Sequence, residues 1–130
     1  MRGRGTRVRQ DDTAPHFGVN NVPGKGTDLV KAVLAYLKIA HPRGVWWPAN
    51  VGAVQVGKRF VRFGVPGMSD IQGVFASTDG GHWHGRAVFV ECKAAKGKQS
   101  PAQKVFQDAV EAAGGLYILA YEIGDVERAL

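Results

Sequence analysis

Residues 67–106 read GMSDIQGVFASTDGGHWHGRAVFVECKAAKGKQSPAQKVF, and they contain two β-type runs followed by the start of a helix. The first run is DIQGVFA and the second is RAVFVECK, and we expect the Gly- and His-rich segment STDGGHWHG between them to be a loop. The second run is apolar on both faces, which is typical of a strand in the middle of a sheet. We therefore predict an antiparallel hairpin about Gly80-Gly81, with its second strand in the centre of the sheet.

The hairpin also brings charged side chains together at its base. Pairing across the two glycines places Asp70 opposite Glu91, and Lys93 points to the same face as Glu91 because side chains alternate along a strand. A slip of one residue would separate the three side chains. Two carboxylates at the end of a buried sheet are costly unless a positive ion lies between them, since like charges in a low dielectric raise a pKa or recruit a cation.

A hard divalent cation resolves this conflict of charges. Mg²⁺ takes one or two protein carboxylates together with carbonyl oxygens, waters and substrate phosphates. We therefore expect Mg²⁺ or Mn²⁺ to bind Asp70, Glu91 and the backbone carbonyl of Cys92. Such an ion lowers the pKa of a bound water, and Lys93 would orient that water or steady the departing charge. This is the chemistry of phosphodiester hydrolysis.

The segments around the hairpin complete an α/β pattern. Ser100 caps a helix that has Pro101 in its first turn and ends at Gly114-Gly115. Helical spacing also predicts a helix from Thr27 to a stop at residues 41–44. VWWPAN, AVQV and RFVRFGV then suit one or two strands, and LYILAY and GDVERAL add a buried strand and a short closing helix. The expected order is helix, about three strands, helix, strand, helix.

The charge of the chain is unevenly distributed. Residues 1–64 hold 11 Lys/Arg against 3 Asp/Glu, whereas residues 65–130 hold 6 against 8. A basic half of this kind favours a polyanionic partner, although a solubilising surface with a basic tail explains it equally well. Residues 1–25 lack periodicity, so we predict a flexible basic arm there and one folded domain at residues 26–130.

Two absences indicate the compartment. The single cysteine forms no internal disulfide, so nothing ties the chain to an oxidising environment. No apolar run is long enough to cross a bilayer, and the first ten residues lack the apolar stretch of a secretory signal. We therefore expect a soluble, intracellular protein with no membrane partner.

The stretch RFVRFGVPGMSDIQGVF, followed by GRAVFVECKAAKGKQSPAQKVFQDAVEAAGGLYILA, resembles the VRR-NUC domain of the PD-(D/E)xK nuclease superfamily, in its short stand-alone form of phages and bacteria. The resemblance covers residues 27–121 and joins, in order, a G-x-x-D turn, an E-x-K strand and an S-P-x-Q helix start. It implies a restriction-endonuclease-like αβββαβ core, here with a short C-terminal helix. It also implies a cytoplasmic, metal-dependent nuclease that acts as a homodimer on branched DNA such as Holliday junctions.

The resemblance also assigns roles to single residues. By position, Asp70 and Glu91 become the metal ligands, Lys93 the catalytic lysine and Gln103 the active-site glutamine. Asp28 is the nearest match to the glutamate that the family places on its first helix, and its side chain is shorter.

Some of these residues have a second explanation. Ser100 and Gln103 form a capping box by sequence, and the cap alone would account for the glutamine. Lys96 and Lys98 either hold phosphates or lie in a solvated loop. The HWH motif at residues 82–84 has the spacing of zinc ligands but no third ligand, so we interpret it as an exposed loop.

Two other classes of function compete with a nuclease. We expect Lys58, Arg59 and Arg62 to hold the DNA backbone, and a non-catalytic nucleic-acid-binding module would use the same basic residues. In that module the carboxylates would only pair with lysines. A structural phage or assembly protein would neither bind DNA nor depend on metal.

Overall fold

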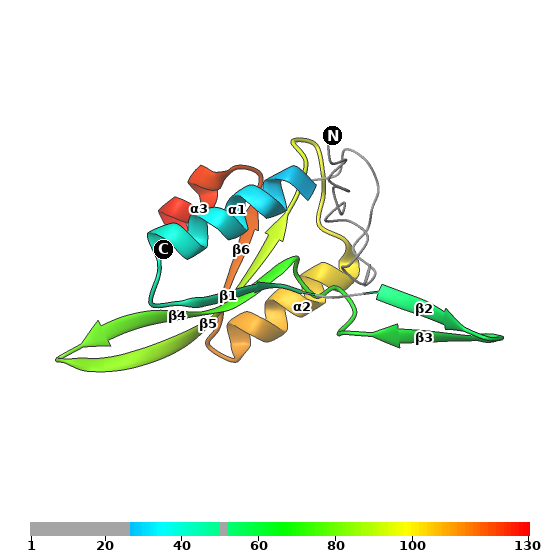
Figure 1. The fold of residues 1–130 in the computed structure, drawn as a ribbon, viewed down its shortest axis with the longest axis horizontal. Coiled ribbons are helices and arrows are strands. Elements are labelled where there is room, and N and C mark those ends of the chain that lie inside the picture. Colours follow the sequence, from blue (N-terminus) through cyan, green and yellow to red (C-terminus); the bar gives the residue numbers. More distant parts are fainter. Residues whose placement is uncertain (1–26, 50–51) are drawn as a thin grey trace, which may run out of the picture.

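The structure, a computed structural model, describes residues 27–49 and 52–130 (Figure 1). The basic arm predicted at residues 1–25 lies outside the described residues. Within them the protein is a mixed α/β fold with a mixed sheet and three helices, none of which is long and apolar enough to cross a membrane. In chain order the elements are α1 (Thr27–Ala40), β1 (Val45–Pro48), β2 (Gly52–Val56), β3 (Arg59–Phe63), β4 (Ile71–Asp79), β5 (His82–Cys92), α2 (Pro101–Ala112), β6 (Leu116–Ala120) and α3 (Ile123–Ala129).

The main sheet has four strands in the order β1-β4-β5-β6. Strand β5 pairs antiparallel with β4 and parallel with β6, which confirms the prediction that it is a central strand. Strands β2 and β3 form a separate two-stranded hairpin between β1 and β4 in the sequence. Our prediction of one or two strands in this region was therefore too low, because three form. Two of them, β2 and β3, pair only with each other and stay out of the main sheet.

The β4–β5 hairpin has the predicted register. Its pairs run from Ile71↔Val90 to Asp79↔His82 around Gly80-Gly81. The expected loop at residues 77–85 was wrong, because both strands continue to the two-residue turn. Gly80 and Gly81 have φ values of 54° and 85°, and a turn with positive φ at both positions matches the twist of the strands beside it. Continued by one step toward the base, the same register places Asp70 opposite Glu91.

Helices cover the sheet on its two faces (Figure 1). Helices α1 and α3 lie on one face, where Val33, Leu37 and Val126 are fully buried against Val88 and Val90 of β5. Helix α2 lies on the other face and packs through Phe106, whose ring centroid is 5.3 Å from that of Phe89 and 6.4 Å from that of Tyr117. Because side chains alternate along β5, Glu91 faces the α2 side, as Phe89 does.

The start and end of α2 follow from local sequence. Ser100 is the N-cap, Pro101 is in the first turn, and Gly114 after the helix has φ 88°, as the sequence predicts. The turn before β4 packs closely on the same helix start, because a Cβ at Gly67 would overlap the backbone of Ala102. This contact holds the segment that carries Asp70 against the segment that carries Gln103.

Candidate active site

The structure brings Asp70 and Glu91 together at the base of the β4–β5 hairpin. Asp70 directly precedes β4, and its Oδ2 accepts a hydrogen bond from the backbone N–H of Cys92 at 2.8 Å. The two carboxyl groups are close enough for each to shift the pKa of the other. The pairing predicted from strand alternation is therefore confirmed as geometry.

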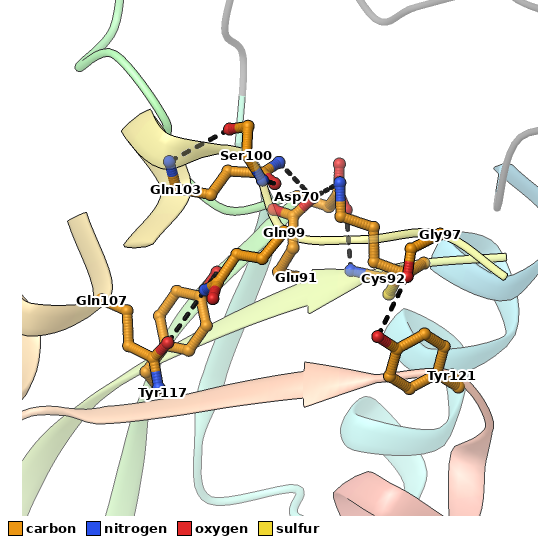
Figure 2. A network of polar contacts seen from close by, with 11 residues as sticks. Asp70, Glu91, Cys92, Gly97, Gln99, Ser100, Gln103, Gln107, Tyr117 and Tyr121 are labelled. Carbon is orange, nitrogen blue, oxygen red and sulfur yellow. Dashed lines mark hydrogen bonds and ion pairs between the residues drawn. The ribbon is translucent and has the colours of Figure 1, made fainter. Parts of the chain in front are cut away.

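Glu91 is deeply buried and only half satisfied (Figure 2). The residue is 4% exposed. Its Oε1 accepts a hydrogen bond from Gln103 Nε2 at 2.8 Å and lies 3.6 Å from Lys93 Nζ. Its Oε2 is buried without a hydrogen-bond partner. A buried charged oxygen without a partner is expensive, and native structures keep such atoms where a ligand or ion completes the site.

The electrostatics of the pair favour a bound cation. Burial and the neighbouring Asp70 raise the pKa of Glu91 to about 7, although the Lys93 ammonium opposes the rise. Burial also raises the pKa of Asp70, against the hydrogen bond from the Cys92 N–H and the charge of Lys93. Burial therefore opposes the ionisation of both carboxyl groups, and the Asp70 charge opposes that of Glu91 further; a divalent ion would remove this resistance. The donor set of hard oxygens with an orphaned Oε2 fits Mg²⁺ or Mn²⁺.

Gln103 forms the capping box that the sequence predicts and also contacts Glu91, which the sequence did not predict. Its Oε1 accepts from the Ser100 N–H at 2.8 Å, while its backbone N–H donates to Ser100 Oγ at 3.1 Å, which completes the capping box. Its Nε2 donates to Glu91 Oε1. One side-chain amide thus caps α2 and orients a carboxylate of the site.

Cys92 takes part through its backbone and not through its thiol. The side chain belongs to the core on the α1 face, and burial raises the pKa of the thiol to about 12, with Asp70 and Glu91 contributing. This excludes it as a nucleophile at neutral pH. Its carbonyl remains a predicted ligand.

The structure does not add a third acidic ligand to the pair. Asp28 is exposed in the first turn of α1, and the described residues contain no cluster of three or more His, Cys, Asp or Glu that could hold a metal. The HWH motif is likewise exposed, at the tip of the β4–β5 hairpin. The expected role of Asp28 therefore finds no geometric support.

The predicted DNA-binding residues lie on two separate segments, the loop after β5 and the β2–β3 hairpin. Lys96 and Lys98 are exposed on the loop between β5 and α2. Lys58 and Arg59 are exposed at the tip of the β2–β3 hairpin, and Arg62 lies further along β3.

A polar network beside the site was not predicted (Figure 2). Gln99 Nε2 donates to Gln107 Oε1 at 2.9 Å and to the Tyr117 hydroxyl at 3.2 Å. Tyr121 Oη donates to the carbonyl of Gly97 at 3.0 Å. These contacts fix the loop from β5 to α2 and thereby the position of its lysines. They join residues on three elements, and no sequence spacing indicates them.

Comparison of the chain with family models, curated proteins and solved structures gives no match. The chemistry of the site must therefore be inferred from its own residues. The decisive features are two carboxyl groups with raised pKa values, one orphaned oxygen, one ammonium and one amide.

Proposed function

We propose that residues 26–130 form a cytoplasmic endonuclease domain that requires Mg²⁺ or Mn²⁺ and hydrolyses DNA phosphodiester bonds, selectively at branched structures such as Holliday junctions. The buried, unpartnered Oε2 of Glu91 beside Asp70 carries the proposal. A site used only for structure gains nothing from an orphaned carboxylate oxygen, whereas a metal site requires a free one.

Each residue of the site has a role in this reaction. Asp70, Glu91 and the carbonyl of Cys92 would hold the ion, which when bound supplies charge neutralisation and an acidified water. Lys93, half-buried beside Glu91, holds its ammonium where it can orient a water and balance charge on a phosphoryl oxygen. Gln103 positions the carboxylate by its hydrogen bond to Oε1.

The order of elements supports the same proposal. With the β2–β3 hairpin set aside, the chain runs α1, β1, β4, β5, α2, β6 and α3, which agrees with an αβββαβ core of the PD-(D/E)xK type and a short closing helix. The acidic pair then lies at the start of the second core strand and the end of the third. This is the arrangement that the resemblance to the VRR-NUC family implies.

The charge of the chain supports DNA as the substrate. Residues 29–69 contain no Asp or Glu and six cationic residues: Lys31, Lys38, Arg43, Lys58, Arg59 and Arg62. Such a segment attracts the phosphate backbone without reading base sequence. A four-way junction has two-fold symmetry, so its resolution requires two copies of the site and hence a homodimer.

The test is cleavage of a labelled four-way junction and a matched linear duplex by the purified chain with Mg²⁺, Mn²⁺ or EDTA. We expect cleavage of the junction that depends on metal and is lost in Glu91→Gln and Asp70→Asn. Asp79→Asn, at the exposed hairpin tip, is the matched control and should cut as wild type. Cleavage in EDTA, or normal cutting by Glu91→Gln, would refute the proposal.

One observation favours the rival function of a non-catalytic nucleic-acid-binding module. The described residues offer two acidic ligands and no third, and Glu91 already has a lysine beside it. The same experiment separates the two functions. Binding of the junction without cleavage in either metal would identify the module.

A further inference from the structure

The β2–β3 hairpin stands apart from the rest of the protein (Figure 1). Its two strands pack on each other and belong to no larger sheet. An isolated two-stranded hairpin is at best marginally stable in water, because it buries little apolar surface. A hairpin that projects in this way therefore needs another surface to cover it.

The exposed apolar side chains of the hairpin also indicate that another surface covers it. Val54, Val56, Val61 and Phe60 are 43%, 59%, 42% and 73% exposed. The register pairs Val54 with Val61 and Gln55 with Phe60. Val54, Val56 and Val61 consequently share one face, on which Arg59 lies opposite Val56 at the tip, and the three valines form an exposed aliphatic strip there. Apolar side chains gathered on one face mark an interaction surface more often than a solvated one.

The two edges of the hairpin differ in charge. Strand β3 reads RFVRF and carries Arg59 and Arg62, whereas β2 reads GAVQV and carries neither charge nor proline. Natural sheets protect exposed edges with charges, prolines or bulges, and β3 is protected in this way. Among residues 27–49 and 52–130, no strand pairs with the other edge of β2, so this edge is open to another strand.

The sequence of β2 is complementary to itself. An antiparallel pair centred on Val54 places Gly52 opposite Val56 of a second copy and Ala53 opposite Gln55, without a charge in the contact. Facing residues lie on the same side of a sheet, so the aliphatic faces of both hairpins become continuous. Pairing through β3 would instead bring the arginines of two copies together, and residues 29–69 contain no acid to neutralise them.

We propose that β2 of one chain pairs antiparallel with β2 of a second copy about a two-fold axis at Val54, so that the two hairpins form one four-stranded sheet. The occupant of the open edge is thus another copy of this chain, held by an isologous contact. The charged β3 strands become the outer edges. The interface is independent of the proposed nuclease activity, and its tests use neither DNA nor metal.

The first test is disulfide cross-linking of single-cysteine substitutions. In the proposed pair, the Cα atoms of the two residues at position 54 lie about 4.5–5.5 Å apart, which is within the range that a disulfide spans. Val54→Cys should therefore form a covalent dimer under mild oxidation, and Val61→Cys, on the outer strand, is the matched control. Cys92 is buried and gives little background. Equal cross-linking at positions 54 and 61, or none at 54, would overturn the proposal.

The second test is sedimentation of charge substitutions without DNA or metal. Wild type should sediment as a dimer, and Val54→Lys should weaken association at least about tenfold, because two lysines would face each other on the axis. Val61→Lys should remain closer to wild type. Circular dichroism should show the main sheet intact in both variants, since the hairpin is separate from it.

Two outcomes of the sedimentation experiment would refute the proposed β2–β2 interface. A monomeric wild type would show that no second copy covers the edge and would overturn the proposal. Equal dissociation by Val54→Lys and Val61→Lys would show that the hairpins meet face to face. If the wild-type protein is a dimer but does not cleave the four-way junction, the result refutes the proposed nuclease activity and leaves the proposed interface standing.

Discussion

Replacing Glu91 by glutamine should stabilise the metal-free protein at alkaline pH. The folded protein raises the pKa of Glu91 from 4.5 to about 7. Folding therefore favours the protonated carboxyl, and the stability it contributes is complete below pH 4.5 and is lost as pH rises through about 7. Glutamine has no proton to lose, so Glu91→Gln should escape this loss.

The size of the gain follows from the pKa shift. One pKa unit corresponds to about 1.4 kcal/mol, which sets an upper limit of about 3 kcal/mol for the full shift. Solvent screening and the loss of the ion pair with Lys93 reduce the net gain to about 1–2 kcal/mol. For a domain of this size that corresponds to a rise in melting temperature of about 5 °C or more.

The assay is urea unfolding of wild type and Glu91→Gln in EDTA at pH 5 and pH 8, followed by circular dichroism. We expect a higher free energy of unfolding for the variant at pH 8 and a much smaller difference at pH 5, where Glu91 is protonated in the folded protein. Mn²⁺ at pH 8 should stabilise wild type and leave the variant unchanged. Glu111→Gln, exposed on α2, is the control.

One result would refute this reasoning. If Glu91→Gln destabilised the protein equally at pH 5 and pH 8, the carboxylate would be a structural partner of Lys93. The unpartnered Oε2 of Glu91 would then be no evidence for a bound cation.

Three further predictions concern the surroundings of the site. Gln103→Ala should lower the free energy of unfolding by about 1–2 kcal/mol more than Ser100→Ala in urea melts, because it removes the contact with the buried carboxylate as well as the cap; equal losses would show that only the cap matters. The thiol of Cys92 should resist alkylation at pH 8 until the chain is unfolded, as followed by mass spectrometry, since it is buried and its pKa is raised to about 12. Gly67→Ala should cost more than about 1 kcal/mol in thermal melts, because φ is 75° there and the added methyl would meet the first turn of α2; an unchanged melting temperature would contradict this packing.

The carboxylate pair could be predicted from the sequence for a simple reason. Gly80-Gly81 fixes the turn, and the period of two along a strand then decides which residues meet, so Asp70 and Glu91 follow by counting. The cap at Ser100 is equally local, because it depends on residues three apart. Both predictions rest on contacts that a short stretch of chain determines by itself.

Contacts between distant elements could not be predicted in this way. The β-type runs of residues 52–63 indicate strands but not their partners, so their exclusion from the main sheet became visible only in the fold. The same holds for Gln99 and Tyr117, whose hydrogen bond depends on how α2 lies on the sheet. Asp28 fits the expected helix, yet the orientation of that helix leaves it exposed.

The β2–β3 excursion begins and ends at one place in the main sheet. Pro48 pairs with Ile71, and the Ala49 N–H donates to the carbonyl of Asp70 at 2.8 Å. An insertion whose two ends are pinned side by side places no strain on its host, so its length can vary at little cost. A change in the length of this excursion would therefore leave the backbone that carries the acidic pair in place, because Ala49 and Asp70 hold its two ends together.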